Sequence, residues 1–301
     1  MSKKYEFTDE TITVDGHTLH RIRAVRCFSD VKAGDLGGWV EKEHNLSHED
    51  YAWVYDEGKV YGDARVIDDA RVFGCAKVYD NALIEGRARV YNHAQVYNDA
   101  SVSNNAEIAD NAMVYNYAKV YDFCFIYGEV QVCDDAAVYG HASVYGRALV
   151  GHQAKVHGNA YICGNSIISD RAEVYGDTLV CDNAKVCSSA LVLGNARIAG
   201  NARIAGTAQV YGNANISGYT EITGDAEVCC HDNYITFKNF WSSGRYFTWT
   251  RSNNMWSVGC FYGTGEELIK KAYKDSKKSG REYERVVRYV ESILEDEKKG
   301  G

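Results

Sequence analysis

The segment Asp69-Ala70-Arg71-Val72-Phe73-Gly74 decides the fold, because its pattern returns every six residues through most of the chain. The fourth position, called the anchor here, is Val or Ile in thirty consecutive hexads from Val54 to Val228, with no insertion or deletion. Two residues before the anchor stands Ala in 24 hexads, and two residues after it stands Gly, Asn or Asp in 27. The chain is therefore built on an internal repeat.

Each position of the repeat suits a short strand that ends in a corner. In an extended chain, residues two apart point to the same face, so Ala and the anchor share one face. Gly, Asn and Asp tolerate the left-handed backbone conformation that a corner requires. A helix is excluded, because a spacing of six would place successive anchors on opposite faces. The chain contains no Pro, as expected where every strand must donate its N–H groups to neighbouring coils.

The repeat resembles that of the hexapeptide-repeat, left-handed parallel β-helix family. The resemblance implies three hexads in each triangular coil, and therefore about ten coils. At about 4.8 Å between strands, the rod would be roughly 48 Å long. The predicted fold class is all-β, with residues 52–230 forming the β-helix, residues 1–51 an N-terminal β-hairpin cap, and residues 231–301 a C-terminal α+β cap.

Both caps follow from the need to cover the open strand edges of a β-helix. At the N-terminal end, Tyr5–Val14 and His17–Phe28 predict a hairpin that turns at Asp15-Gly16. At the C-terminal end, residues 234–262 are rich in aromatic and β-branched residues and predict a small antiparallel sheet. Thr264–Glu297 then predicts two helices with a break near Ser279-Gly280.

A more specific resemblance lies before the rod. The segment Val31–Val40, the triplet Asn45-Leu46-Ser47 and the Ala-x-Val-Tyr-Gly hexads are similar to phage- and bacterium-encoded hexapeptide-repeat proteins that carry transferase or polymer-like labels. This resemblance implies a phage-associated protein, with a host-directed binder or inhibitor as a special case. Proteins of this fold commonly form parallel trimers, so it also implies a homo-oligomer, with a trimer favoured.

The overall charge narrows the classes of partner. The net charge is −8, whereas a generic nucleic-acid or anionic-membrane binder needs a basic excess. No apolar run is long enough to span a bilayer, and the N-terminal MSKKYEFTDE lacks the apolar core of a signal peptide. We therefore expect a protein of the bacterial or phage-infected cytoplasm, whose ten cysteines are thiols.

Candidate catalytic and metal-binding residues are few. Acyltransferases of this fold build their pockets with a loop that leaves the coil, and the repeat contains no such loop. The candidate bases are the corner histidines His93, His141, His152 and His157. The last two, in Val150–Gly158, match the His-x4-His spacing of γ-class carbonic anhydrases, which share three zinc-binding histidines across a trimer interface. The position of the third ligand holds Tyr139, two residues from His141. We expect no cofactor, and we keep this metal site as an alternative.

Tyrosine marks the outer faces of the rod. The position after the anchor points outward and holds Tyr in 12 of thirty hexads. With three hexads in each coil, these side chains align into ladders. One interpretation is that stacked neighbours stabilise each sheet. The other is that they form a surface for a partner, since Tyr is favoured at interfaces. The candidate partner surface comprises Tyr55, Tyr61, Tyr79, Tyr91, Tyr97, Tyr115, Tyr127 and Tyr145.

Two classes of function remain open. The first is a non-catalytic scaffold or binding protein that presents its faces and caps to a macromolecular partner, which we expect to be a protein. The second is a hexapeptide-type acyltransferase, or a γ-carbonic-anhydrase-like metal site, at a subunit interface. The unbroken repeat favours the first class.

Overall fold

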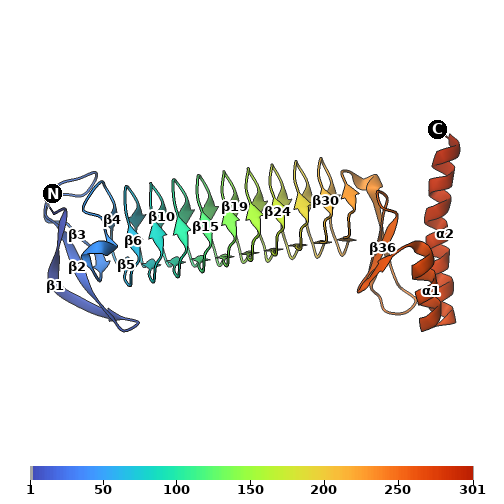
Figure 1. The fold of residues 1–301 in the computed structure, drawn as a ribbon, viewed down its shortest axis with the longest axis horizontal. Helices are drawn as coiled ribbons and strands as arrows, with labels where there is room; N and C mark the ends of the chain where they lie inside the picture. Colours follow the sequence, from blue (N-terminus) through green and yellow to red (C-terminus); the bar gives the residue numbers. More distant parts are fainter. Residues whose placement is uncertain (1–2, 301) are drawn as a thin grey trace.

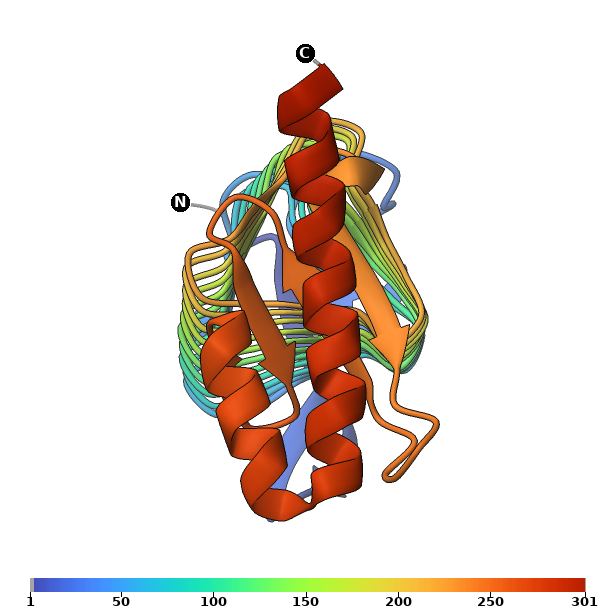
Figure 2. The ribbon, with the colours of Figure 1, turned by 90° about the vertical axis from the view of Figure 1, so that its right-hand side faces the viewer.

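A computed structural model of the chain describes residues 3–300, which form a rod with a different cap at each end (Figure 1). Every hexad contributes one two-residue strand, made of the anchor and the residue before it, from β4 (Trp53–Val54) to β33 (Glu227–Val228). Strands that are three hexads apart pair in parallel, so that β7 (Arg71–Val72) lies beside β10 (Arg89–Val90). The strands thus form three sheets, the walls of the triangle seen end-on in Figure 2. The all-β parallel β-helix with two caps is confirmed.

The core is a continuous column inside the rod. All thirty anchor side chains, from Val54 to Val228, are 0% exposed, and the Ala side chains beside them are buried as well. Fully burying a Val or Ile side chain contributes about 1.5–3 kcal/mol, so the column is the main source of stability. An inserted or deleted residue would move the following anchors out of this column, which explains why the repeat contains neither.

The corners have the conformation that their residue types predict. Of the thirty residues that stand two after an anchor, 29 have a positive φ. These include the two that break the residue rule within the rod, His152 (φ 55°) and Ser188 (φ 62°). The exception is Cys230 (φ −155°), where the chain leaves the last coil for the C-terminal cap.

An incomplete eleventh turn precedes the ten predicted coils. The strand β3 (Leu36–Val40) pairs in parallel with β5 (Lys59–Val60), and Leu46 bridges Val66. In both pairings, the two partners are slightly more than three hexads apart in the sequence, because the corner after Leu46 is longer than the corners of the rod. The longer corner breaks the period of six, which is why the sequence pattern did not include this turn.

The N-terminal cap continues one wall of the rod. The predicted hairpin is present, with β1 (Tyr5–Val14) antiparallel to β2 (His17–Ala24). The second strand ends at Ala24, four residues before the predicted Phe28, whose ring packs instead on Trp53 of the first coil. Because β2 pairs with β3, and β3 with β5, the hairpin covers the open edge of this wall.

The buried side chain of Lys4 connects the N-terminal cap to the start of the first coil. Its side chain is 0% exposed, and Nζ donates to the carbonyl oxygen of Ala52 at 2.7 Å and to that of Glu49 at 3.2 Å. Burial lowers the pKa of Lys4 from 10.5 to about 8, and the nearby Arg26 acts in the same direction.

We expect this lysine to make stability depend on pH. Between about pH 8 and pH 10 the unfolded chain binds more protons than the folded chain, so Lys4 makes the free energy of unfolding rise with pH, by up to about 3 kcal/mol. The urea midpoint of the wild type, measured relative to that of Lys4→Met, should therefore rise with pH in this window. A difference that stays constant from pH 7 to pH 10 would contradict this.

The C-terminal cap is a sheet covered by two helices. The antiparallel strands are β34 (Tyr234–Lys238), β35 (Tyr246–Thr250), β36 (Met255–Val258) and β37 (Phe261–Gly263). Side chains of this cap reach the last coil: Thr248 Oγ1 accepts the N–H of Glu221 at 3.2 Å, and Ser252 Oγ, in the turn between β35 and β36, accepts that of Glu227 at 2.7 Å. The cap therefore satisfies part of the strand edge that the rod would otherwise expose.

The two predicted helices are α1 (Gly265–Asp275) and α2 (Lys277–Gly300), which lie side by side at the end of the rod (Figure 2). The predicted break near Ser279-Gly280 is wrong: the chain turns at Ser276, whose backbone is extended. Gly280 lies within α2, where a Cβ atom would come within 2.3 Å of the Tyr273 ring. This glycine therefore permits close packing of the helices and does not end one. Neither helix, nor any other within residues 3–300, is long and apolar enough to cross a membrane.

Candidate functional site

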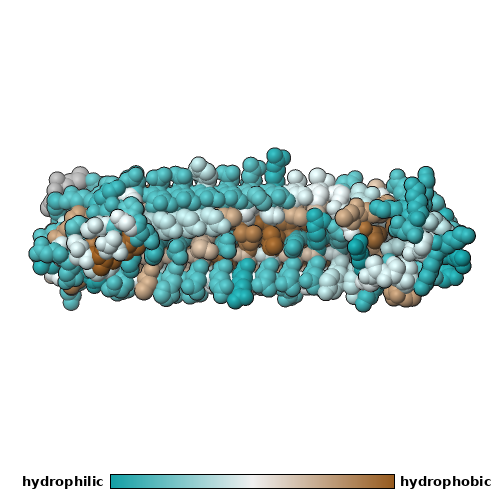
Figure 3. All heavy atoms as spheres, turned by 90° about the horizontal axis from the view of Figure 1, so that it is seen from below, coloured by the Kyte–Doolittle hydropathy of each residue, from teal (hydrophilic) through white to brown (hydrophobic). Residues whose placement is uncertain are grey.

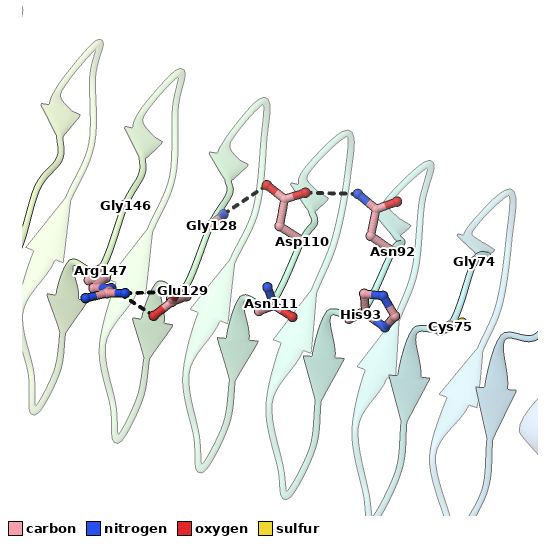
Figure 4. Close-up of a pocket in the computed structure, with 10 residues that line it drawn as sticks. All are labelled: Gly74, Cys75, Asn92, His93, Asp110, Asn111, Gly128, Glu129, Gly146 and Arg147. Atoms are coloured by element: carbon pink, nitrogen blue, oxygen red, sulfur yellow. Dashed lines mark hydrogen bonds and ion pairs between the residues drawn. The ribbon is translucent and has the colours of Figure 1, made fainter.

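A groove of about 590 Å³ runs along one corner of the rod (Figure 4). Two columns of side chains line it, and within a column each residue stands three hexads after the previous one, on the next coil. The first column is Gly74, Asn92, Asp110, Gly128 and Gly146, and the second is Cys75, His93, Asn111, Glu129 and Arg147. The groove is therefore a direct product of the stacked corners.

The first column ties successive coils together. Asp110 accepts the backbone N–H of Gly128 at 3.2 Å through Oδ2 and the side-chain amide of Asn92 at 3.0 Å through Oδ1 (Figure 4). The same carboxylate-to-backbone bond, to the equivalent residue of the next coil, recurs at other corners: Asp56, Asp68, Asp80, Asp122, Asp134, Asp170 and Asp182. These aspartates stabilise the stack of corners.

We expect Asp110→Ala to lower the free energy of unfolding by about 1 kcal/mol more than an Ala substitution at a positive-φ corner without this hydrogen bond does, because about 1 kcal/mol is the usual net contribution of a hydrogen bond. The loss stays modest because water can replace the carboxylate at an exposed corner. Urea unfolding measures it, and Ser188→Ala is the matched control, because Ser188 is a corner residue with a similar positive φ (62°) and its hydroxyl forms no hydrogen bond within residues 3–300. Equal stability of the two variants would show that the corner bonds contribute nothing.

The second column places a thiol, an imidazole and a carboxamide on three successive coils. Cys75 and His93 are both exposed, and Asn111 follows His93 (Figure 4). These are the residue types of a nucleophile, a base and an orienting amide, but no hydrogen bond joins Cys75 to His93 in the described part of the chain. From the sequence, His93 was identified but not its neighbours Cys75 and Asn111, although each of them stands three hexads from His93.

His157 belongs to a ring ladder. Its imidazole lies between the rings of Tyr139 and Tyr175, with centroid distances of 4.5 and 4.8 Å. Its Nε2 lies 2.8 Å from Oε1 of Glu173. Tyr121 extends the same stack beyond Tyr139. His157 therefore has a packing role that the sequence pattern, which aligned only the tyrosines, did not predict.

The other two candidate histidines lie at corners. His152 is exposed, and its Nδ1 lies 3.5 Å from Oδ1 of Asp170. His141 is exposed and stacks on Phe123 at 5.1 Å. Within residues 3–300 of one chain, no three His, Cys, Asp or Glu side chains lie close enough together to hold a metal ion.

The tyrosine ladder nearest the N-terminal cap is continuous. Tyr61, Tyr79, Tyr97 and Tyr115 stack with centroid distances of 4.9–5.1 Å. One member of the candidate partner surface is corrected here: Tyr61 is 2% exposed, because the hairpin covers it, and its hydroxyl donates to Asp15 at 2.8 Å. Burial also raises the pKa of Tyr79 to about 12.

The remaining seven tyrosines of the candidate partner surface are half-buried. Some of their hydroxyls bond to the neighbouring coil, as when Tyr115 donates to Gln131 Oε1 at 3.0 Å and Tyr91 to Glu107 Oε2 at 3.2 Å. These contacts agree with the stabilising interpretation. A partner surface on the ladders stays a prediction.

One wall also carries an apolar stretch. Seen from below in Figure 3, apolar side chains gather midway along the rod. The outward positions of the wall that continues from the hairpin include Cys133, Leu149 and Ile167 in this region. Leu149 and Ile167 are half-buried by their neighbours on the same wall.

Comparison with known proteins adds one short similarity. No protein-family model matches the chain. A segment of 42 residues is 40% identical to the "uncharacterized acetyltransferase YdcK" of Escherichia coli strain K12. The match spans 14% of this chain and 13% of that protein, far less than the whole of either. Together with the β-helix, it supports a hexapeptide-repeat protein.

Proposed function

We propose that the chain is a rigid binding protein, in which the β-helix holds the two caps apart and a protein partner docks on the C-terminal cap. The observation that carries the proposal is Phe240, whose side chain is 81% exposed on the loop between β34 and β35. Fully burying a Phe side chain contributes about 1.5–3 kcal/mol, so a partner that covers Phe240 would gain this free energy.

Other exposed aromatic residues surround this end of the rod. Tyr219 on the last coil is 57% exposed and stacks on Tyr246 of the cap at 4.8 Å. Tyr289 on α2 is also 57% exposed. Aromatic side chains are enriched in the centres of protein interfaces, because they bury much area at low entropic cost. The resemblance to phage-encoded proteins supports a host protein as the partner.

A second candidate function is acetyl transfer, which the short similarity to YdcK favours. Of the candidate bases, His93 is the one that lines the corner groove. An exposed imidazole can act as a general base toward a group held beside it. Binding of acetyl-coenzyme A would be the first sign of this activity.

One experiment separates these functions: a native mass spectrum of the protein purified from its own cells without chelators. We expect the wild type to retain a protein partner in a fixed ratio. Phe240→Ser should lose the partner, whereas Tyr117→Ser, at a residue 60% exposed on a rod corner, should keep it. The mass of three chains would support the trimer expected from the fold resemblance.

Two results would overturn the binding proposal. One is a wild type that carries coenzyme A or zinc and no protein, which would favour the enzyme and call for variants of His93, His152 and His157. The other is a partner that Phe240→Ser retains as well as the wild type does.

A further inference from the structure

The C-terminal cap contains a cavity of about 310 Å³ between its sheet and its helices. Apolar side chains of strands and helices line one part, among them Val258, Leu268 and Ala272. Charged side chains that are exposed to solvent line another part: Arg245, Lys271 and Asp275. Ligand cavities in proteins combine an apolar lining with a few polar groups in this way, and they begin at about this volume.

Two cationic side chains, Arg245 and Lys271, line this cavity. Within residues 3–300, neither Arg245 nor Lys271 forms an ion pair, whereas Arg251 of the same cap pairs with Glu297 at 2.6 Å. The ammonium of Lys271 lies over the ring of Phe261, 5.2 Å from its centroid, and this ring also lines the cavity. Because Asp275 is the one carboxylate among the described lining residues, positive charge is in excess there.

Two hydroxyl groups in the lining show no acceptor within the described residues, and one of them belongs to a buried tyrosine. Tyr283 is 7% exposed, and its oxygen accepts from Asn239 Nδ2 at 3.0 Å, but the described part of the chain shows no acceptor for its own proton. Burial raises the pKa of Tyr283, so this hydroxyl keeps its proton at neutral pH. Ser279 also lines the cavity, and its hydroxyl bonds to no group within residues 3–300 but reaches solvent. An acceptor on a bound ligand can take a hydrogen bond from either hydroxyl in place of water.

We propose that this cavity binds a small organic acid with an apolar body. The acid group accepts from Arg245, Lys271 and the free hydroxyls of Tyr283 and Ser279, while the body rests on Val258 and Leu268. The guanidinium and the ammonium carry positive charge and can only donate hydrogen bonds, which favours an oxyanion over a neutral or cationic group. Phe240 does not line this cavity, and the inference does not depend on the proposed partner.

Saturation-transfer NMR on the full-length protein tests the site with three probes. Benzoate has both the charge and an apolar body, benzamide has the same shape without the charge, and inorganic phosphate has the charge without the body. We expect benzoate to bind, benzamide to bind about tenfold more weakly, and phosphate to displace benzoate poorly. Equal binding of benzoate and benzamide would overturn the charge requirement, and efficient displacement by phosphate would overturn the role of the apolar body.

Variants locate the binding. Lys271→Met and Arg245→Gln should each weaken benzoate binding about tenfold, because each removes one charged donor. Lys270→Met, at the exposed neighbouring residue on α1 that does not line the cavity, is the matched control and should bind as the wild type does. Unchanged melting temperatures show that all three variants fold. Benzoate binding that survives both cavity variants, or that Lys270→Met also loses, would refute this site. Phe240→Ser should leave benzoate binding intact, so this inference and the partner surface can fail independently.

Discussion

Lys119→Pro is expected to divide the unfolding of the rod into two transitions. Lys119 lies in β15 (Lys119–Val120) near the middle of the rod, and its N–H donates to the carbonyl oxygen of Ala136 on the next coil at 2.9 Å. Proline removes this donor and restricts the backbone, at a cost of about 3 kcal/mol. In a stacked repeat each coil contacts only its neighbours, so a weak interface near the middle uncouples the two halves.

Calorimetry and hydrogen exchange measure this effect. Exchange should become faster in the coils that flank residue 119 and change little near the two caps. Lys119→Ala is the control, because it removes the same side chain and keeps the N–H; its unfolding should remain a single transition near the wild-type temperature. A single, unshifted transition for Lys119→Pro would show that the ladder of backbone bonds is not what couples the coils.

Gly38→Val is expected to detach the N-terminal cap and lower the free energy of unfolding by about 3 kcal/mol. A Cβ atom at Gly38 would lie 2.5 Å from the carbonyl oxygen of Gly58 and 2.6 Å from Cγ1 of Val54. The Gly58 oxygen is backbone and accepts the N–H of Trp39, so it cannot move away without loss of that bond. Displacing β3 would expose the strand edge of β5 (Lys59–Val60), an edge that can pair with another rod.

Urea unfolding and sedimentation velocity report the two consequences, loss of stability and association of rods end to end. Gly16→Ala is the matched control: Gly16 has a positive φ of 88° in the hairpin turn, but a Cβ atom there meets nothing within 4 Å. Gly16→Ala should lower the free energy of unfolding only by the backbone strain, about 1 kcal/mol, and this variant should not associate end to end. A Gly38→Val protein that matches the wild type in both measurements would show that the close contact is tolerated.

The candidate site was less predictable than the rod. The spacing of three hexads is enough to place Cys75 beside His93 and to align the tyrosines, because residues that are three hexads apart in the sequence lie next to each other on adjacent coils. The same interval could not predict that Tyr61 is buried, since the covering hairpin lies in a distant part of the chain and pairs with the rod through β3. Nor could it reveal the cavity around Arg245 and Lys271, whose lining comes from a loop, two strands and two helices without a common period.

By itself, the sequence determined the parallel β-helix, its corners and its core. Each of these depends on interactions between residues that are a constant number of positions apart in the sequence. The structure of one hexad therefore predicts that of all thirty. The tertiary structure alone decided where the caps sit on the rod, which tyrosines they cover, where the helices turn and which charges remain without a partner. These features depend on packing between segments that share no repeat. For example, the chain turns at Ser276, whereas Gly280 lies inside α2 against the ring of Tyr273.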